Sequence, residues 1–331
     1  MIISRTPFRV SFFGGGTDYP AWYREHGGAV LATTIDKYCY ISVRELPPFF
    51  DHRFRIVYSI VENVKEIDDI RHPAARAVLT RLGVTKGLEI HHDGDLPARS
   101  GLGSSSAFTV GLISALAALD GRYSSKEALA SEAIHVEQCM LQEAVGVQDQ
   151  ISTAFGGFNH ITFRPDGSFE VNPMVLPPAR IEALQDHLML VFTGVSRIAA
   201  EIAQSQLDNL QHRRTELRTV QEMVDQAVVI LTSPTTDLSE FGRLLHQSWM
   251  IKRTLSARVS TPAVDDLYDA ALRAGAIGGK LLGAGGGGFM LLFVRPEDRP
   301  RVVEALGDRI AVPVRFEASG SRIVLYQPNG L

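Results

Sequence analysis

Three glycine-rich segments constrain the fold of this 331-residue chain more than any other feature. They occupy residues 14–16, 101–103 and 283–288. Glycine adopts positive φ angles and lets a backbone approach closely, at an entropic cost. Three such clusters in one chain predict three places where the backbone turns tightly or lies against a ligand.

The composition is typical of a compact globular protein, with 45% hydrophobic and 21% charged residues, and the length predicts one large domain or two moderate ones. The net charge of −4 and the lack of a basic stripe argue against a nucleic-acid or membrane partner. Cys39 and Cys139 lie far apart, which favours two buried thiols over a disulfide or zinc site. The charged N-terminus does not resemble a secretory signal, so we expect a cytoplasmic protein.

Apolar runs and turn signals predict a mixture of strands and helices. The expected strands cover residues 8–13, 29–35, 38–43, 88–92, 188–192 and 289–294. The expected helices cover residues 104–119, about 124–144, a short stretch capped by Asp149, 197–231, 238–251 and 262–274. An S-x-x-E capping box at residues 124–127 opens the second of these helices. The elements do not alternate as in a doubly wound sheet, so an α+β fold is favoured, with a domain junction near residue 180.

Two familiar phosphate-binding motifs fail in this sequence. Residues 274–281 resemble a Walker A loop but have Ala for its first Gly and Leu where Ser or Thr must hold magnesium. Residues 283–288 satisfy G-x-G-x-x-G but lead into an expected strand instead of a helix. Residues 97–107 differ, because their glycines and serines open an expected helix, where free N–H groups favour anionic oxygens. Such a segment predicts phosphate binding, although by itself it is more often a plain helix cap.

Residues 7–19, 97–107 and 280–288 resemble, in order and spacing, the three motifs of the GHMP small-molecule kinases. Within that superfamily, residues 14–20 and 27–38 most resemble those of the D-glycero-D-manno-heptose 7-phosphate kinases. The resemblance implies a two-domain α+β fold. Residues 1–180 would form an N-terminal domain like domain 2 of ribosomal protein S5, and residues 181–331 a ferredoxin-like C-terminal domain. It also implies transfer of phosphate from ATP to the anomeric hydroxyl of a sugar phosphate, for nucleotide-heptose synthesis in lipopolysaccharide or capsule.

The same resemblance assigns the catalytic and nucleotide-binding residues. Asp149 matches the catalytic aspartate, and Arg9 matches the basic residue that faces it. Ser105 and Glu137 match the ligands of Mg²⁺, an ion that keeps several waters and takes its other ligands from nucleotide phosphate. Taken without the resemblance, Asp149 would be a helix cap and Glu137 part of a solvated face. The expected ATP-phosphate loop comprises Pro97, Arg99, Ser100, Gly101, Leu102, Gly103, Ser104, Ser105 and Ser106.

The expected acceptor wall comes from the first glycine segment. Asp18 matches the residue that accepts hydrogen bonds from sugar hydroxyls in the sugar-using members. Galactokinases carry a Glu-His pair where this chain has two glycines, and mevalonate-type kinases carry lysine in place of Arg9, so both substrates are disfavoured. Beside Asp18, the expected wall contains Gly15, Gly16 and Thr17, with Gly285 and Gly286 from the third segment.

A phosphate on the acceptor would need its own cations, preferably with bidentate geometry. Lys252 and Arg253 are the candidates, joined by Arg197 or Arg258. The alternative is that these charges belong to a helix face that covers apolar surface.

Two other functions stay open at this level. One is a fucokinase-like enzyme that acts on an unphosphorylated deoxy sugar, because fucokinases have a similar first motif. The other is a non-catalytic sensor that binds ATP and sugar, and the presence of both the magnesium ligands and the Arg9 and Asp149 pair counts against it. Neither the adenine pocket nor the oligomeric state follows from the sequence, so a homo-oligomer is left open.

Overall fold

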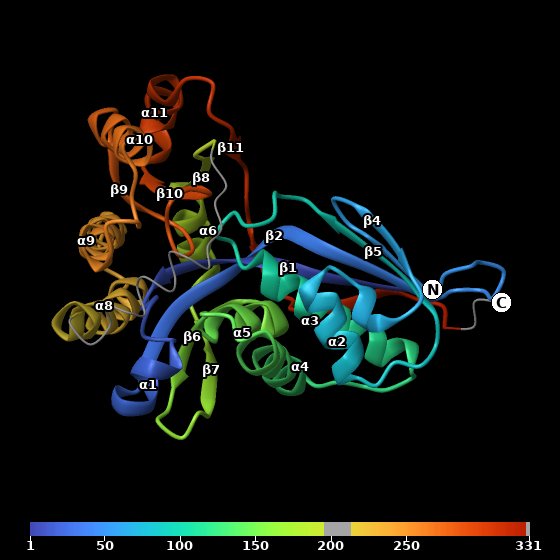
Figure 1. Ribbon diagram of the computed structural model, residues 1–331. Coiled ribbons are helices and arrows are strands. Elements are labelled where there is room, and N and C mark those ends of the chain that lie inside the picture. The colour runs from blue at the N-terminus through green and yellow to red at the C-terminus, as the bar shows by residue number, and fades with distance from the viewer. Residues whose placement is uncertain (195–212, 329–331) are drawn as a thin grey trace.

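The computed structural model describes residues 1–194 and 213–328, and its strands form two separate sheets (Figure 1). The first sheet has the order β13-β1-β2-β5-β3-β4, with β6 and β12 also paired to β2 and with β7 paired to β6. Its strands are β1 (Ile2–Phe13), β2 (Gly28–Glu45), β3 (Phe54–Val57), β4 (Val61–Val64), β5 (Leu88–Gly94), β6 (Phe158–Phe163), β7 (Phe169–Pro173), β12 (Phe316–Glu317) and β13 (Arg322–Tyr326).

Helices pack against this first sheet and carry much of the site. The long helix α3 is buried along most of its length and contacts β1 and β2, where Ser4 Oγ donates a hydrogen bond to the Gly111 carbonyl (2.8 Å). Its small and apolar residues suit such a position. The helices of this part are α1 (Pro20–His26), η1 (Ile67–Asp69), α2 (Pro73–Arg81), α3 (Ser104–Leu119), α4 (Lys126–Ile134), the π-helix η2 (His135–Met140) and α5 (Gln148–Phe155).

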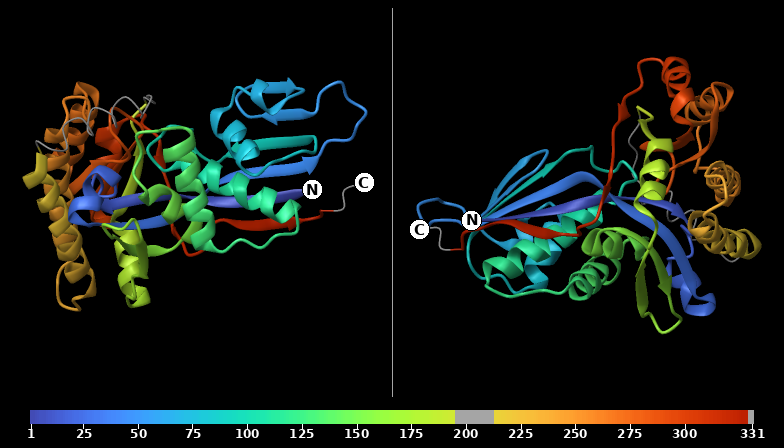
Figure 2. Two further views of the ribbon diagram at one scale, coloured as in Figure 1. Left: turned by 60° about the horizontal axis from the view of Figure 1, so that its bottom comes forward. Right: turned by 180° about the vertical axis from the view of Figure 1, so that it is seen from behind.

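The second sheet has the order β11-β8-β10-β9. Its strands are β8 (Leu188–Phe192), β9 (Ala276–Leu281), β10 (Phe289–Val294) and β11 (Ala311–Val312), and its helices are α6 (Pro178–His187), α8 (Arg214–Thr232), α9 (Ser239–Leu255), α10 (Pro262–Arg273), η4 (Pro296–Asp298) and α11 (Arg299–Leu306). Figure 2 shows from two further sides that α8 and α9 stand at one end of β1 and β2, where α8 contacts both strands and α9 contacts β1.

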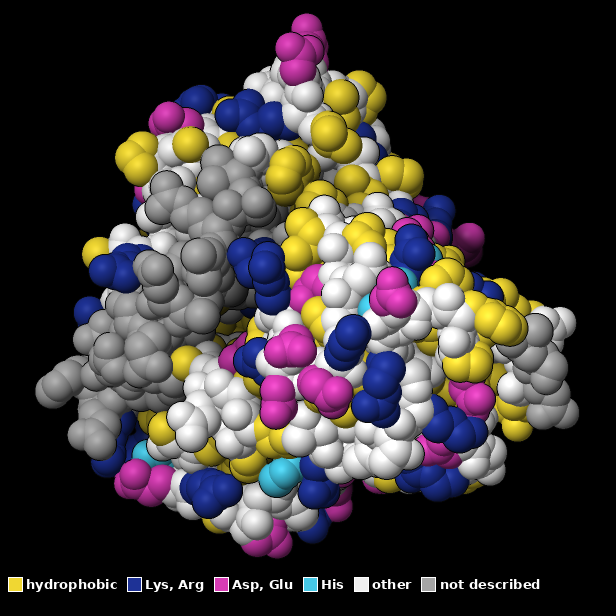
Figure 3. Space-filling view, turned by 45° about the vertical axis from the view of Figure 1, so that its right-hand side comes forward, with side chains coloured by type: hydrophobic (Ala, Val, Ile, Leu, Met, Phe, Trp, Pro, Cys, Tyr) yellow, Lys and Arg dark blue, Asp and Glu magenta, His cyan; other side chains and the backbone are white. Residues whose placement is uncertain are grey.

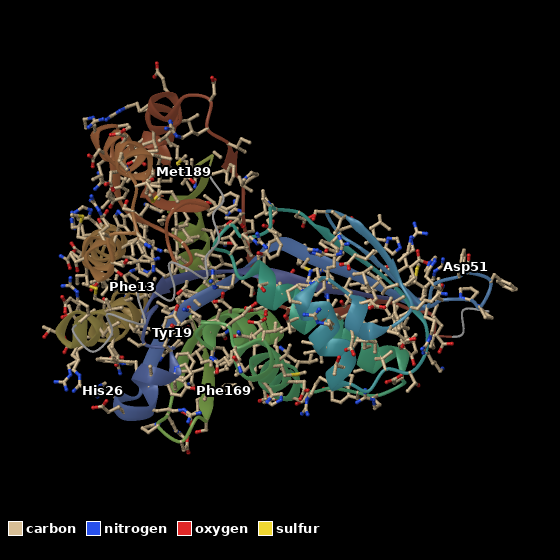
Figure 4. The ribbon with its side chains drawn as sticks, in the orientation of Figure 1. Phe13, Tyr19, His26, Asp51, Phe169 and Met189 are labelled. Atoms are coloured by element: carbon tan, nitrogen blue, oxygen red, sulfur yellow. The ribbon has the colours of Figure 1, made fainter. Side chains whose placement is uncertain are left out.

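Aromatic side chains join the two parts in one core. The rings of Phe12 and Phe13 meet the ring of Phe241 edge-on, with centroids 5.4 and 5.1 Å apart. Figure 4 shows Phe13 and Tyr19 on the side of the first sheet that faces α8 and α9, whereas Met189 lies farther up in the second part. Edge-on aromatic pairs and apolar burial stabilise this contact, so the surfaces on either side of it are held together.

The last strands of the chain return to the first sheet. β13 pairs antiparallel with β1, and β12 pairs with β2, so residues 316–326 belong to the first sheet, whereas the expected division placed everything after residue 180 in the second part. The backbone N–H of Gln327 donates to the Met1 carbonyl (2.9 Å), so the end of β13 lies beside the start of β1 (Figure 1). Strands this short leave a weak hydrophobic pattern in the sequence.

The predicted α+β architecture is confirmed, and several elements have the expected bounds. α3, β8 and β10 span the predicted residues 104–119, 188–192 and 289–294. Among the described strand pairs, β3 and β5 alone are parallel, as a fold without βαβ alternation requires. The strands expected at 29–35 and 38–43 form the single strand β2. A helix was expected at 197–231, and in the described part of that range the structure has α8.

Two local predictions were wrong, and one strand, β9, was not expected. The helix expected up to residue 144 changes to a π-helix and ends at Met140, and its N-cap is Ser125, which accepts from Ala128 N (3.2 Å). The glycines before Lys280 form the strand β9, because a Cβ on Gly278 would lie 2.0 Å from the Gly242 carbonyl oxygen of α9. A glycine strand therefore allows a close helix contact. Finally, Cys39 is buried but Cys139 is exposed.

The surface agrees with the charge pattern of the sequence. On the face drawn in Figure 3, Lys and Arg side chains are interspersed with Asp and Glu. In the described part of the chain, no helix combines the length and the apolar character needed to cross a membrane.

Candidate active site

A pocket of about 320 Å³ lies where β1, α3 and α5 meet α9 and the loop after β9. It brings together residues from all three glycine-rich segments. Of the predicted site residues, those that line it are Arg9, Gly15, Gly16, Asp18, Arg99, Gly101, Gly103, Ser104, Ser105, Ser106, Glu137, Asp149 and Lys252. Pockets of this size with convergent polar groups are typical of small-molecule sites.

An ion pair between Arg9 and Asp149 lies in the wall of the pocket. Arg9 Nε and Nη2 each donate to one Asp149 carboxylate oxygen, both at 2.7 Å. The Arg9 side chain is 5% exposed, whereas that of Asp149 is 27% exposed, so the carboxylate remains accessible from the pocket. Bidentate pairs of this kind fix orientation as well as charge. Asp149 occupies the first turn of α5, whose N-cap is Val147, so the simple helix-cap interpretation of this aspartate does not hold.

Arg9 also connects this carboxylate to the predicted phosphate loop. Its Nη1 donates to the Gly101 carbonyl (2.6 Å), and its backbone N–H donates to the Leu102 carbonyl (3.0 Å). Gly101 has a φ of +82°, and a Cβ there would lie 2.5 Å from the Leu282 carbonyl oxygen. The loop therefore lies directly on the third glycine segment, and this contact requires glycine.

The predicted phosphate loop divides into residues that line the pocket and residues that support it. Ser104, Ser105 and Ser106 form the first turn of α3 and line the pocket. The N–H groups of a first helical turn have no intrahelical acceptor, so such a position suits an anion. Pro97 is exposed outside the pocket, and Ser100 is buried, with its carbonyl accepting from Phe289 N (3.2 Å). Leu102 is also buried and does not line the pocket.

Glu137 is a buried carboxylate with one oxygen left unpaired. It lies on the π-helix η2 and is 1% exposed. Its Oε2 accepts from Ser106 Oγ (2.9 Å) and from Gln150 Nε2, whereas its Oε1 has no hydrogen-bond partner among the residues that the structure describes. Burial, with the Glu143 charge also contributing, raises the pKa of Glu137 to about 7. A buried carboxylate oxygen without a donor is costly, and a cation in the pocket would offset that cost.

This arrangement fits a magnesium ion that is held mainly by nucleotide. The unpaired Glu137 Oε1 is an oxygen ligand of the kind Mg²⁺ takes, and Ser105 lines the same pocket. Ser106 contacts Glu137 directly, whereas Ser105 is exposed. The described residues contain no cluster of three or more His, Cys, Asp or Glu that would hold a metal by themselves.

The acceptor wall contains a second buried carboxylate, Asp18. It is 2% exposed, and its Oδ1 accepts from Gly16 N (2.9 Å). Burial raises its pKa, and the charge of Asp149 acts in the same direction. Thr17 does not line the pocket: its hydroxyl donates to the Gly14 and Ala29 carbonyls and so fixes the turn that carries Asp18.

Replacing Gly146 by Ala should disturb this wall selectively. A Cβ at Gly146 would lie 1.8 Å from Asp18 Oδ2, so the carboxylate must move. Because misplacing a binding group by about 1 Å can cost about 10²-fold, we expect kcat/KM for the acceptor to fall by about 10- to 100-fold. Steady-state kinetics with each substrate varied in turn test this, and an unchanged acceptor KM with a weakened ATP KM would contradict it.

The structure does not assemble the predicted cation clamp. Lys252 lines the pocket, and its Nζ donates to the Leu281 and Gly283 carbonyls at 2.8 and 2.5 Å. Arg253 lies outside the lining and pairs with Asp265 (3.1 Å). Arg258 is not among the lining residues either, and Arg197 lies outside the described residues.

Gly285 and Gly286 lie outside the pocket lining as well. A Cβ on Gly285 would lie 2.7 Å from the Val259 carbonyl oxygen, and Gly286 N donates to that oxygen (2.9 Å). These glycines hold the third segment against the loop after α9.

Lys280 is a pocket residue that the sequence analysis did not assign. It lies on β9, is 5% exposed, and its Nζ donates to the Phe12 carbonyl (2.8 Å). Burial, with the Arg9 charge as a further cause, lowers the pKa of Lys280 to about 7. The available signal was a single lysine between Gly279 and Leu281 in an otherwise uncharged stretch, since an unpaired lysine is rarely buried without a role.

Two family models and several relatives match this chain. The model of the GHMP kinases N-terminal domain matches residues 68–157, and that of the GHMP kinases C-terminal domain matches residues 229–311. The chain is 30% identical to a D-glycero-alpha-D-manno-heptose 7-phosphate kinase of Campylobacter jejuni, over 92% of this chain and 93% of that protein. It is 26% identical to a bifunctional fucokinase/GDP-fucose pyrophosphorylase of Arabidopsis thaliana, over 89% of this chain and 30% of that protein.

A solved structure shares the fold over the whole length. The crystal structure of a D-glycero-D-manno-heptose 1-phosphate kinase from Bacteroides thetaiotaomicron superposes with a TM-score of 0.80 at 23% identity, covering 99% of this chain and 100% of that one. The two-domain fold, the matched family domains and the Campylobacter relative agree with one another. The chain therefore belongs to the GHMP kinases, and within them it is a sugar kinase.

Proposed function

We propose that this protein transfers phosphate from ATP to the anomeric hydroxyl of D-glycero-D-manno-heptose 7-phosphate and forms the 1,7-bisphosphate. The observation that carries the proposal is the bidentate Arg9–Asp149 pair in one pocket with the serine-bearing start of α3. The similarity to the Campylobacter heptose 7-phosphate kinase supports the choice of sugar.

In this proposal Asp149 orients the acceptor hydroxyl and takes its proton as the new bond forms. Arg9 acts on the carboxylate by holding both of its oxygens, and it joins that carboxylate to the loop at Gly101. The N–H groups of residues 104–106 stabilise the phosphate oxygens of ATP. In phosphoryl transfer through a loose transition state, positioning and electrostatics of this kind supply most of the acceleration.

Ser105 and Glu137 would hold Mg²⁺ beside the nucleotide phosphates. When bound, this ion neutralises charge on the phosphate oxygens. Support for the site comes from the unpaired Oε1 of the buried Glu137, which lines the same pocket as Ser105. Ser106 then serves as a hydrogen-bond donor that orients the Glu137 carboxylate.

A second candidate is a sugar 1-kinase that acts on L-fucose. The similarity to the Arabidopsis fucokinase favours it, and so does the failure of Arg253 to reach the pocket, because an unphosphorylated sugar needs no cation clamp. A non-catalytic sensor of the same fold is disfavoured, because Arg9, Asp149 and Glu137 are assembled in one pocket.

A panel of acceptors separates these functions. ATP consumption is measured with D-glycero-D-manno-heptose 7-phosphate, the corresponding 1-phosphate, unphosphorylated heptose, L-fucose and D-galactose, and the phosphorylated carbon of each product is assigned by NMR. We expect the highest kcat/KM with the 7-phosphate and a phosphate on the anomeric carbon. Preference for L-fucose would support the second candidate. If the enzyme instead phosphorylated the 1-phosphate at carbon 7, the proposed reaction at the anomeric carbon would be wrong.

A further inference from the structure

The cationic side chains that line the pocket differ in how many hydrogen-bond acceptors the protein gives them. Arg9 is matched by the carboxylate of Asp149, which takes two of its hydrogen bonds. Lys280 is buried in the same pocket, and in the described residues its Nζ has one hydrogen-bond partner, the Phe12 carbonyl. Because an ammonium group carries three N–H donors, two of them have no protein acceptor there. A buried charge in this state calls for an anionic ligand.

The position of Lys280 relates it to both substrates. β9 leads from Lys280 into Leu282 and Gly283, which lie on Gly101 of the phosphate loop. The carbonyl that Lys280 binds belongs to Phe12, two residues before the first glycine segment, which carries the acceptor wall. Lys280 thus stands between the side of the pocket that faces ATP and the side that faces the sugar.

Electrostatic coupling agrees with this placement. The charge of Arg9 disfavours protonation of Lys280, and the charge of Asp18 favours it. Lys252 is coupled in turn to Lys280 and to Arg9, so the three cations form one group. Lys252, however, uses two of its donors on the Leu281 and Gly283 carbonyls, where it ties α9 to the third glycine segment. Lys280 has the larger share of its donors left for a ligand.

We propose that the Lys280 ammonium group binds the non-bridging oxygens of the phosphoryl group that passes from ATP to the acceptor. This inference rests on the proposed function as a kinase and adds a catalytic residue to it. The bond between the γ-phosphorus and the bridging oxygen of ADP breaks, and ADP keeps its electron pair. The bond between the acceptor oxygen and phosphorus forms, and the acceptor proton goes to Asp149. Lys280 stabilises the charge of the group in transit.

The kinetic test uses Lys280→Met, which removes the charge and keeps a side chain of similar length. Loss of one donor to a developing charge typically costs about 10²-fold or more in kcat, so we expect kcat to fall by about 100-fold. The loss should be equal with the sugar phosphate and with the unphosphorylated sugar. A loss confined to the phosphorylated acceptor would assign Lys280 to the acceptor's own phosphate and overturn the proposal. Lys86→Met, at an exposed lysine paired with Glu45, is the matched control.

A binding measurement keeps this test independent of the choice of sugar. Calorimetry gives the affinities of ADP and of the non-hydrolysable analogue AMPPNP, each with Mg²⁺, for the wild type and for Lys280→Met. We expect the ratio of the two affinities to shift by about tenfold against AMPPNP in the variant, while an unchanged ADP affinity shows that the variant is folded. An unchanged ratio would overturn the role of Lys280. If the wild type bound neither nucleotide, the proposed kinase function itself would fail, and this inference with it.

Discussion

Replacement of Asp149 by Asn is expected to lower kcat by about 10²–10⁴-fold, the range that a general base contributes. An amide keeps the shape of the side chain but cannot take the proton of the acceptor hydroxyl. It also gives up one of the two Arg9 hydrogen bonds, because one carboxylate oxygen becomes an NH₂ group. The KM for ATP should change little, since Asp149 does not bind the nucleotide in this proposal. Steady-state and single-turnover kinetics measure both quantities.

Asp120→Asn, at an exposed aspartate at the end of α3, provides the matched control and should keep wild-type kinetics. Thermal unfolding of both variants checks that the fold is retained. If Asp149→Asn keeps more than about a tenth of wild-type turnover, the loss of rate is smaller than the factor that a general base contributes. Asp149 would then have to be removed from the catalytic role.

Replacement of Glu137 by Gln should have a comparable effect through a different cause. The substitution removes the negative charge at the proposed magnesium site and keeps the side-chain volume. Charge stabilisation by a bound metal is worth several kcal/mol, and about 4 kcal/mol corresponds to about a thousandfold in rate. We expect kcat to fall by about that factor, together with a rise in the Mg²⁺ concentration needed for half-maximal activity.

The titration of activity with Mg²⁺ distinguishes this role from a structural one. Glu132→Gln on α4 is the matched control, since Glu132 pairs at the surface with Arg81 and does not line the pocket. A Glu137→Gln enzyme with a wild-type Mg²⁺ requirement and a lowered melting temperature would show that Glu137 acts in packing. The amide oxygen of this variant can still accept from Ser106, so the hydrogen bond that orients the side chain is retained and the change isolates the charge.

Much of the local structure could be predicted because it depends on neighbouring residues. The small residues and serines at 104–119 predicted α3 with its bounds, and the apolar runs at 188–192 and 289–294 predicted β8 and β10. The glycines at 101 and 103 before three serines predicted a helix start suited to anions. These signals arise within one turn or one strand, where residues that are close in sequence are also close in space.

The paired members of the site could not be predicted by spacing alone. Arg9 and Asp149 are 140 positions apart and meet because β1 and α5 pack together. Lys252 and Arg253 are neighbours in sequence, yet Lys252 reaches the pocket and Arg253 pairs with Asp265, since successive helical residues point in different directions. The packing of α9 against β9 decides which of the two faces the pocket.

The sequence by itself therefore determined the start of α3, the glycine loops and, through the resemblance of its three motifs, the kinase fold. The tertiary structure alone decided which charges share the pocket: it buried Lys280, left Glu137 Oε1 unpaired, and turned Arg253 away. It also returned residues 316–326 to the first sheet. The physical reason is that periodicity and turn chemistry act over a few residues, whereas burial and charge pairing depend on which surfaces finally pack together.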